Sequence, residues 1–184
     1  SALVLALNDY KRQLARRTFR SPEGRRLHPT VNLGGVFAAG EGGKINTVPA
    51  AASFTIDRRV LPTESGREAE RELRAFLRAA VKKIPRCRIT IEKISHNHSC
   101  YTPPAHPLFC AMHASVARVR RRPARFMVST GFNDMHFFAQ VLKIPTIGYG
   151  PSGRDYHAVN ERARLKDLTD SAKIYADLLT TFRG

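Results

Sequence analysis

Apolar residues recur in the first half of the chain with the spacings of helices and strands. Leucines and a tyrosine in a basic segment predict a helix over about residues 2–17. Two strands are predicted next, at Thr30–Gly34 and Ala51–Leu61, on either side of a glycine-rich loop, Ala39–Lys44. A second helix is predicted over Gly66–Lys83, so this half alternates between helical and extended elements.

The second predicted helix has clear boundaries in the sequence. Thr63 and Ser65 both stand where an N-cap belongs, and Pro85 cannot continue a helix. Arg88–Ile94 then alternates apolar and polar residues with the period of a half-buried strand. The order helix, strand, strand, helix, strand is that of a ferredoxin-like β-α-β-β-α-β sandwich without its first strand. We therefore assign residues 1–97 to an α+β domain of this kind.

The second half of the chain, residues 98–184, follows a different pattern. A linker rich in proline and histidine, His98–Pro107, leads into helices that alternate with short apolar strands. The predicted helices are Leu108–Arg121, Asn133–Leu142 and Leu165–Phe182, and the predicted strands are Arg125–Ser129 and Ile144–Gly148. Such alternation is typical of parallel β-α-β units, so an α/β fold is expected here. A unit of this kind alone exposes a sheet edge, and we expect a partner segment outside this sequence.

Composition argues against several classes of protein. No apolar run approaches the roughly 20 residues that cross a bilayer. The segment Ser1–Leu7 is too short for a signal peptide and lacks its basic lead, and it is interpreted as a helix already begun in a longer chain. Cys87, Cys100 and Cys110 lack CxxC spacing, so reduced thiols and a cytoplasmic location are expected.

The formal net charge of +16 raises the question of a nucleic-acid partner. Basic residues are spread along the chain, with two denser patches at Arg16–Arg26 and Arg118–Arg125. Neither patch carries the interleaved aromatic residues of a single-strand binder, and no nucleic-acid-binding motif is present. A solvated basic surface is the favoured interpretation, with neither nucleic acid nor a membrane as partner.

The most informative candidate for chemistry is the histidine in the loop Gly148–Glu161. His157 follows an apolar run and a glycine-rich turn, at the place where ligands gather in open α/β sheets. An imidazole there can bind a metal through one nitrogen while a neighbour orients the other. Because one histidine is never a complete metal site, we expect the chain to hold only part of one.

Four short motifs occur in a specific order along the chain. They are Asn46–Pro49, Asp57–Pro62, Gly131–Phe137, and Gly150–Pro151 with His157–Glu161. Together they resemble the C-terminal part of the di-zinc amidohydrolase family that includes succinyl-diaminopimelate desuccinylase, acetylornithine deacetylase, aminoacylase and glutamate carboxypeptidase. The resemblance covers residues 2–182. It implies that residues 1–97 are an inserted lid domain, which usually dimerises, and that residues 98–184 return into the catalytic α/β domain.

The resemblance also implies roles for single residues. His157 corresponds to a zinc ligand, and Arg59 to an arginine that binds a substrate carboxylate. The other implied substrate-binding positions are Asn46, Gly131, Asn133, Asp134, His136 and Gly153. The whole enzyme would bind two zinc ions, with cobalt and manganese as alternatives. Its remaining ligands, its Glu-Glu general base and a lid histidine belong to segments upstream of these 184 residues, so no catalytic residue is assigned in this chain.

Simpler explanations exist for several of these residues. Arg59 shares one face of its strand with Asp57, and the aspartate could form no more than a surface salt bridge. Asn46 could serve only to shape a turn. Asp134 could serve only to cap a helix or to compensate its dipole. His136 stands where the family has an arginine, which points to a different substrate.

The expected function is that of the C-terminal part of a zinc-dependent amidohydrolase, inactive by itself, which acts on an N-acyl amino acid or peptide bond beside a carboxylate. The expected partners are a small carboxylate-bearing amide substrate, the missing N-terminal segment, and a second copy bound through the lid. Two alternatives stay open: a non-catalytic dimerisation or binding module, and a basic nucleic-acid-binding protein whose affinity would fall steeply with salt. His96 and His98 are interpreted as a polar strand end rather than as a metal pair.

Overall fold

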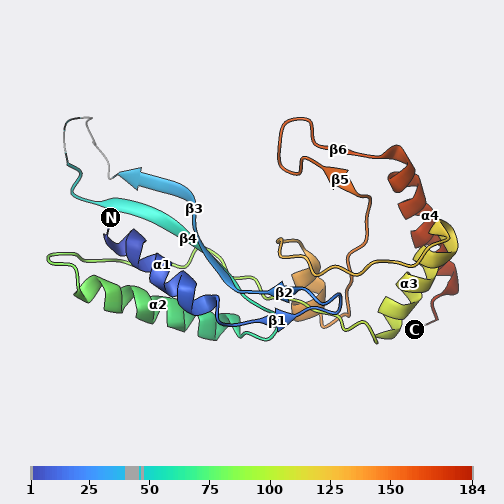
Figure 1. The fold of residues 1–184 in the computed structure, drawn as a ribbon, viewed down its shortest axis with the longest axis horizontal. Coiled ribbons are helices and arrows are strands. Elements are labelled where there is room, and N and C mark those ends of the chain that lie inside the picture. Colours follow the sequence, from blue (N-terminus) through green and yellow to red (C-terminus); the bar gives the residue numbers. More distant parts are fainter. Residues whose placement is uncertain (1, 40–45, 47, 184) are drawn as a thin grey trace. The chain divides into compact units, whose positions relative to one another are not determined.

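The computed structural model describes residues 2–39, 46 and 48–183. The chain divides into two compact units, unit 1 (residues 1–99) and unit 2 (residues 100–184), each with its own apolar core (Figure 1). Apart from Ala39, the predicted loop Ala39–Lys44 lies outside the described residues. Every helix among the described residues is too short or too polar to serve as a membrane span.

Unit 1 consists of two helices and a long antiparallel strand pair, with a short hairpin between the first helix and the sheet. Its elements are α1 (Ala2–Leu14), β1 (Phe19–Arg20), β2 (Arg26–Leu27), β3 (Thr30–Ala39), β4 (Ala52–Arg59) and α2 (Gly66–Lys82). The two helices and two long strands predicted from periodicity are confirmed. β3 and β4 pair from Thr30↔Arg59 to Ala39↔Ala52, with a register shift between Leu33 and Phe37.

One face of the β3–β4 sheet is covered by α1 and α2 (Figure 1). The buried residues of this core are Leu3, Leu7, Tyr10, Leu14, Val31 and Leu77. Phe54 and Ile56 of β4 pack against the same core. Because side chains alternate along a strand, Arg58 falls on this covered face and Asp57 and Arg59 fall on the other. The alternation separates a buried arginine from an exposed one.

The N-cap of α2 is Ser65. Its hydroxyl oxygen accepts a hydrogen bond from the Glu68 backbone N–H at 3.3 Å, so of the two predicted caps, Thr63 and Ser65, the structure uses the second. Replacing Ser65 by alanine is expected to lower the free energy of unfolding by about 1 kcal/mol, because one N–H of the first turn loses its acceptor. Urea unfolding measures the change, with Thr63→Ala as the matched control. Equal losses in the two variants would contradict the cap assignment.

The prediction of a strand at Arg88–Ile94 is wrong. The segment has no ladder partner among the described residues, although Ile89 and Ile91 pack against the core of unit 1. The carbonyl oxygen of Ile91 accepts a hydrogen bond from Nη1 of Arg74 on α2 at 2.9 Å. The alternation of apolar residues therefore reflects burial of one side of the segment, and not pairing of its backbone with another strand.

Unit 2 is built on two helices that lie side by side, α3 (Pro107–Arg120) and α4 (Leu165–Thr181) (Figure 1). Its other elements are the π-helix η1 (Phe137–Val141), β5 (Gly153–Arg154) and β6 (Arg162–Ala163). The first and last predicted helices of this half are thus confirmed. The buried core between α3 and α4 contains Met112, Val116, Ile174 and Leu178.

Part of the basic patch Arg118–Arg125 is neutralised inside unit 2. Arg118 of α3 pairs with Asp177 of α4 at 2.5 Å, and Arg120 pairs with Asp167 at 3.3 Å. The Arg120 and Asp167 side chains are only 12% and 5% exposed. These two arginines therefore join the helices, and Arg120 is largely withdrawn from solvent.

The predictions of strands at Arg125–Ser129 and Ile144–Gly148 are also wrong, and the only ladder among the described residues of unit 2, β5–β6, is antiparallel. A parallel strand needs a ladder to a neighbouring strand, and neither segment forms a ladder in the described part of the chain. The helix predicted over Asn133–Leu142 is shortened to η1. It ends where Lys143 adopts a φ of 57° and a proline, Pro145, follows.

Candidate functional site

His157 lies in the loop of a short hairpin formed by β5 and β6 (Figure 1). Three residues of this loop, Asp155, His157 and Asn160, have positive φ values of 58°, 61° and 71°. Few non-glycine residues adopt this left-handed conformation, and each does so at a cost on the order of 1–3 kcal/mol. Aspartate, histidine and asparagine adopt this conformation more often than other non-glycine residues, so the sequence of the loop suits its backbone.

Hydrogen bonds within the loop hold the backbone of His157 and leave its ring exposed. The His157 N–H donates to Oε2 of Glu161 at 3.3 Å, and the Ala158 N–H donates to the Asp155 carbonyl oxygen at 3.0 Å. Oδ2 of Asp155 also pairs with Arg162 at 3.1 Å. No described residue hydrogen-bonds the imidazole of His157. The ring is therefore available to an external partner.

The exposed imidazole of His157 fits the role of a single metal ligand. Neutral histidine is the most common metal ligand in proteins, but zinc takes at least three protein ligands. Within the described ranges, no group of three or more histidine, cysteine, aspartate or glutamate side chains is placed to hold a metal ion. The loop thus offers one ligand, and a complete site needs donors from elsewhere.

The predicted site segment Gly131–His136 forms a turn ahead of η1. The Gly131 N–H donates to Oγ of Ser129 at 3.1 Å, and Oδ1 of Asn133 accepts the Met135 N–H at 3.1 Å. The Asn133 side chain therefore caps the turn, which is the structural role expected of Asp134. The Asp134 side chain is exposed, and no described residue binds its carboxylate.

His136 supports this turn from inside. It is 6% exposed, and its ring packs against Phe132 and Phe137 at centroid distances of 5.2 and 4.2 Å. Nδ1 of His136 lies 2.9 Å from the Asn133 carbonyl oxygen, which can only accept, so Nδ1 carries the proton. The imidazole is consequently held in place, and it does not face solvent.

The N–H of Gly153, predicted to face substrate, is already engaged. It donates to Oη of Tyr156 at 2.6 Å. A Cβ at this position would lie 2.8 Å from the Tyr156 ring, so a larger residue here would displace the tyrosine side chain. A substrate would have to displace the tyrosine hydroxyl to reach this donor. The spacing of Gly153 and Tyr156 in the sequence does not predict this hydrogen bond.

Unit 1 carries the two remaining predicted site residues, Asn46 and Arg59. Asn46 is exposed in a turn. Nε of Arg59, the last residue of β4, donates to Oδ2 of Asp57 at 2.7 Å, and the two side chains are 43% and 45% exposed. A pair this exposed contributes at most about 1 kcal/mol. Nη1 and Nη2 of Arg59 have no partner among the described residues, so the outer edge of its guanidinium is free to bind a carboxylate.

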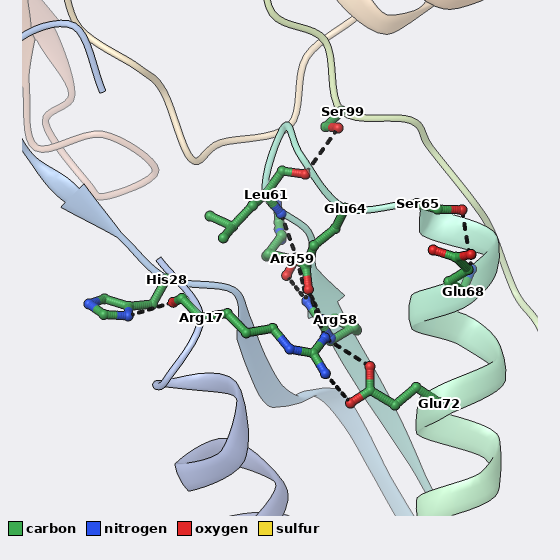
Figure 2. Close-up of polar contacts among 10 residues, drawn as sticks. All are labelled: Arg17, His28, Arg58, Arg59, Leu61, Glu64, Ser65, Glu68, Glu72 and Ser99. Atoms are coloured by element: carbon green, nitrogen blue, oxygen red, sulfur yellow. Dashed lines mark hydrogen bonds and ion pairs between the residues drawn. The ribbon is translucent and has the colours of Figure 1, made fainter. Parts of the chain in front are cut away.

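Arg58 and Glu64 form a buried polar cluster behind Arg59, shown in Figure 2. Nη2 of Arg58 lies 2.9 Å from Oε1 of Glu64, and the two side chains are 7% and 12% exposed. Glu64 also accepts the Leu61 N–H at 2.8 Å and Nη1 of Arg17 at 3.0 Å. Burial raises the pKa of Glu64, but these hydrogen bonds outweigh it and hold the pKa below its usual range.

Glu64 was not identified from the sequence as a site residue. The sequence feature that could have pointed to Glu64 is its position six residues after Arg58, across a turn that contains proline. Many surface glutamates have such a position, and only the tertiary contacts distinguish this one.

His96 and His98 have a structural environment in unit 1. Their rings meet edge to face at a centroid distance of 4.7 Å, and a Cβ at Gly66 would lie 2.3 Å from the His96 ring. Burial lowers the pKa of His96. Packing against the first turn of α2 accounts for the pair without a metal.

Comparison with known proteins confirms the resemblance predicted from the four motifs. A family model described as peptidase family M20/M25/M40 matches residues 16–181. One relative, a succinyl-diaminopimelate desuccinylase from Methylocella silvestris, is 32% identical over 69 residues, which are 38% of this chain and 17% of the relative.

A solved structure has a similar fold. It is an M20 family metallo-carboxypeptidase from Sulfolobus solfataricus, matched with a TM-score of 0.63 and 22% sequence identity over 97% of this chain and 44% of that chain. The chain therefore spans less than half the length of either relative. Because the family model extends through both units and covers most of the residues, the chain belongs to peptidase family M20/M25/M40.

Proposed function

We propose that this chain forms the lid and the C-terminal part of the catalytic domain of a zinc-dependent amidohydrolase. Its substrate would be an N-acyl amino acid or peptide whose scissile amide lies beside a carboxylate. The observation that carries the proposal is the family match over residues 16–181, which includes both the Arg59 strand and the His157 loop. The names of the two relatives, a desuccinylase and a metallo-carboxypeptidase, support the same chemistry.

In this proposal unit 1 is the lid and unit 2 belongs to the catalytic domain, with the boundary near residues 97 and 98. The helix–strand–strand–helix order of unit 1 supports a ferredoxin-like lid. A division of the chain at residue 99 supports the boundary. A second copy would bind along an edge of the β3–β4 sheet, because an edge strand can pair with a strand of another chain.

The residues of this chain would bind the metal and orient the substrate. His157 would hold one zinc ion through its exposed ring. Two bound zinc ions, or cobalt or manganese in their place, would polarise the scissile carbonyl and activate a water molecule. Arg59 would bind the substrate carboxylate through Nη1 and Nη2 while its Nε stays hydrogen-bonded to Asp57. The side chains of Asn46 in unit 1 and of Asp134 in unit 2 are both exposed, and each would be free to bind substrate.

Unit 2 exposes large apolar side chains, which supports its belonging to a larger domain. The exposed fractions around η1 are 59% for Phe132, 63% for Val141 and 58% for Leu142, and those on α4 are 80% for both Leu165 and Leu179. Apolar patches of this kind mark interaction surfaces when they are contiguous. We propose that further residues of the catalytic domain cover them.

Replacing Arg59 by lysine in the full-length protein is expected to lower kcat/KM for an N-succinyl amino acid about tenfold, mainly through KM. Lysine keeps the charge but loses the planar fork, and a hydrogen bond to a charged group contributes about 1.5–3 kcal/mol. Steady-state kinetics measure the change. Arg71→Lys is the control, since Arg71 pairs with Glu68 on the surface of α2. Unchanged kinetics in Arg59→Lys would refute the role proposed for this arginine.

A further inference from the structure

Arg58 fixes the backbone from Arg59 to Leu61, directly and through Glu64. Its Nη1 donates to the Arg59 carbonyl oxygen. Its two terminal nitrogens also bind the two oxygens of the Glu64 carboxylate, with Nη2–Oε1 at 2.9 Å and Nη1–Oε2 at 3.5 Å. Oε2 of Glu64 accepts the Leu61 N–H at 2.8 Å. One buried ion pair therefore holds the peptide groups of both Arg59 and Leu61.

Glu64 is in turn held by its own surroundings (Figure 2). Its N–H donates to the Leu61 carbonyl oxygen at 3.0 Å, which closes the turn that follows β4. Arg17 donates to Glu64 at 3.0 Å and to Glu72 of α2 at 2.6 Å. The carboxylate that binds Arg58 is thus anchored to the segment after α1 and to α2, and it cannot shift without disturbing both.

We propose that Arg58 and Glu64 are positioning residues for Arg59, which they keep oriented for binding a substrate carboxylate. This inference rests on the proposed function, in which Arg59 binds that carboxylate. Among the described residues, the Arg59 guanidinium forms a hydrogen bond to Asp57 alone, so its direction depends on a fixed backbone. A displacement of about 1 Å at a group that orients substrate can cost about 100-fold in rate.

A role in stability alone is a weaker explanation for the Arg58–Glu64 pair. Burying two charges costs solvation, and buried ion pairs are often no more stabilising than apolar residues of the same size. A bidentate arginine–carboxylate pair does fix geometry, because the planar guanidinium permits few orientations. The place of the pair directly behind an exposed arginine, on the covered face of the sheet, suits such a function.

The test is a double-mutant cycle between positions 58 and 59 in the full-length protein, with an N-succinyl amino acid as substrate. Arg58→Lys retains the positive charge and loses the bidentate contact with the Glu64 carboxylate. We expect it to raise KM and lower kcat/KM about tenfold when Arg59 is present, and to change kcat/KM less than about twofold in the Arg59→Ala background, because coupled residues are not additive. Arg74→Lys is the control, since Arg74 also pairs with a glutamate, Glu70 on α2, but in the described part of the chain it forms no hydrogen bond to the Arg59 backbone.

The outcomes separate this inference from the proposed function. If Arg59→Ala alone leaves kcat/KM unchanged, the function proposed for Arg59 is wrong and the inference falls with it. If Arg59→Ala lowers kcat/KM but Arg58→Lys lowers it equally in both backgrounds, or not at all, only the positioning role is overturned. A second, independent double-mutant cycle combines Glu64→Gln with Arg59→Ala. If both Arg58→Lys and Glu64→Gln lose cooperative thermal unfolding, the pair holds the fold and the positioning role is rejected.

Discussion

Replacing His157 by glycine in the full-length protein is expected to lower the rate of zinc-dependent amide hydrolysis at least about 100-fold. Removing a residue that only hydrogen-bonds a metal ligand already costs about 10- to 100-fold in metal affinity or activity, and removing the ligand itself should cost at least as much. Glycine is the suitable substitution because His157 has a φ of 61°, which glycine adopts without strain. The loop should therefore keep its conformation and lose only the imidazole. Activity and bound zinc, measured by elemental analysis after dialysis, should fall together.

Asn160→Gly is the matched control for this experiment. Asn160 lies in the same loop with a φ of 71°, and no metal role is assigned to it. The control should retain both activity and zinc. If His157→Gly also retains both, His157 is not a ligand. If both variants lose activity equally, the loop conformation matters and the imidazole has no separate role.

The second large effect is expected on stability. Glu64→Gln should lower the free energy of unfolding by about 3 kcal/mol, because removing one partner of a buried ion pair leaves an unpaired buried charge. That charge is Arg58, which is 7% exposed. Urea unfolding followed by circular dichroism measures the loss. The matched control is Glu70→Gln on α2, where the carboxylate is 28% exposed, and this change should be much smaller.

The same contacts predict how stability depends on pH. The pKa of Glu64 is lowered in the folded protein, so the pair stabilises the fold at pH values above the unfolded pKa of roughly 4.3. The contribution is lost as the pH falls from there through the folded pKa. The difference in stability between the wild type and Glu64→Gln should therefore be constant near neutral pH and shrink below about pH 4. A difference that stays constant down to pH 2 would show that ionisation of Glu64 contributes nothing.

Periodicity predicted the helices and the longer strands of unit 1 because these elements bury one continuous face. Leucines at helical spacing in α1 do form part of the core, and alternation along β4 correctly placed Asp57 and Arg59 on one face. The choice between Thr63 and Ser65 as the cap could not be made from the sequence, because both residues can accept the same type of hydrogen bond.

Other features depend on contacts that periodicity does not encode. Ile89 and Ile91 pack against the core of unit 1, and this burial does not require their segment to pair with another strand. His136 gave no sign of its burial between two phenylalanines, and the anchoring of Glu64 by residues distant in sequence was equally hidden. The left-handed backbone of His157 is set by the hydrogen bonds of its loop, whereas the sequence suggested only that a loop was present.

The most direct test of the account is the anomalous scattering of zinc in crystals of the full-length protein. We expect a zinc ion at about 2.0–2.1 Å from a ring nitrogen of His157, the usual zinc–imidazole distance. A fully occupied zinc site elsewhere in the protein, with the His157 ring directed into solvent, would contradict the account.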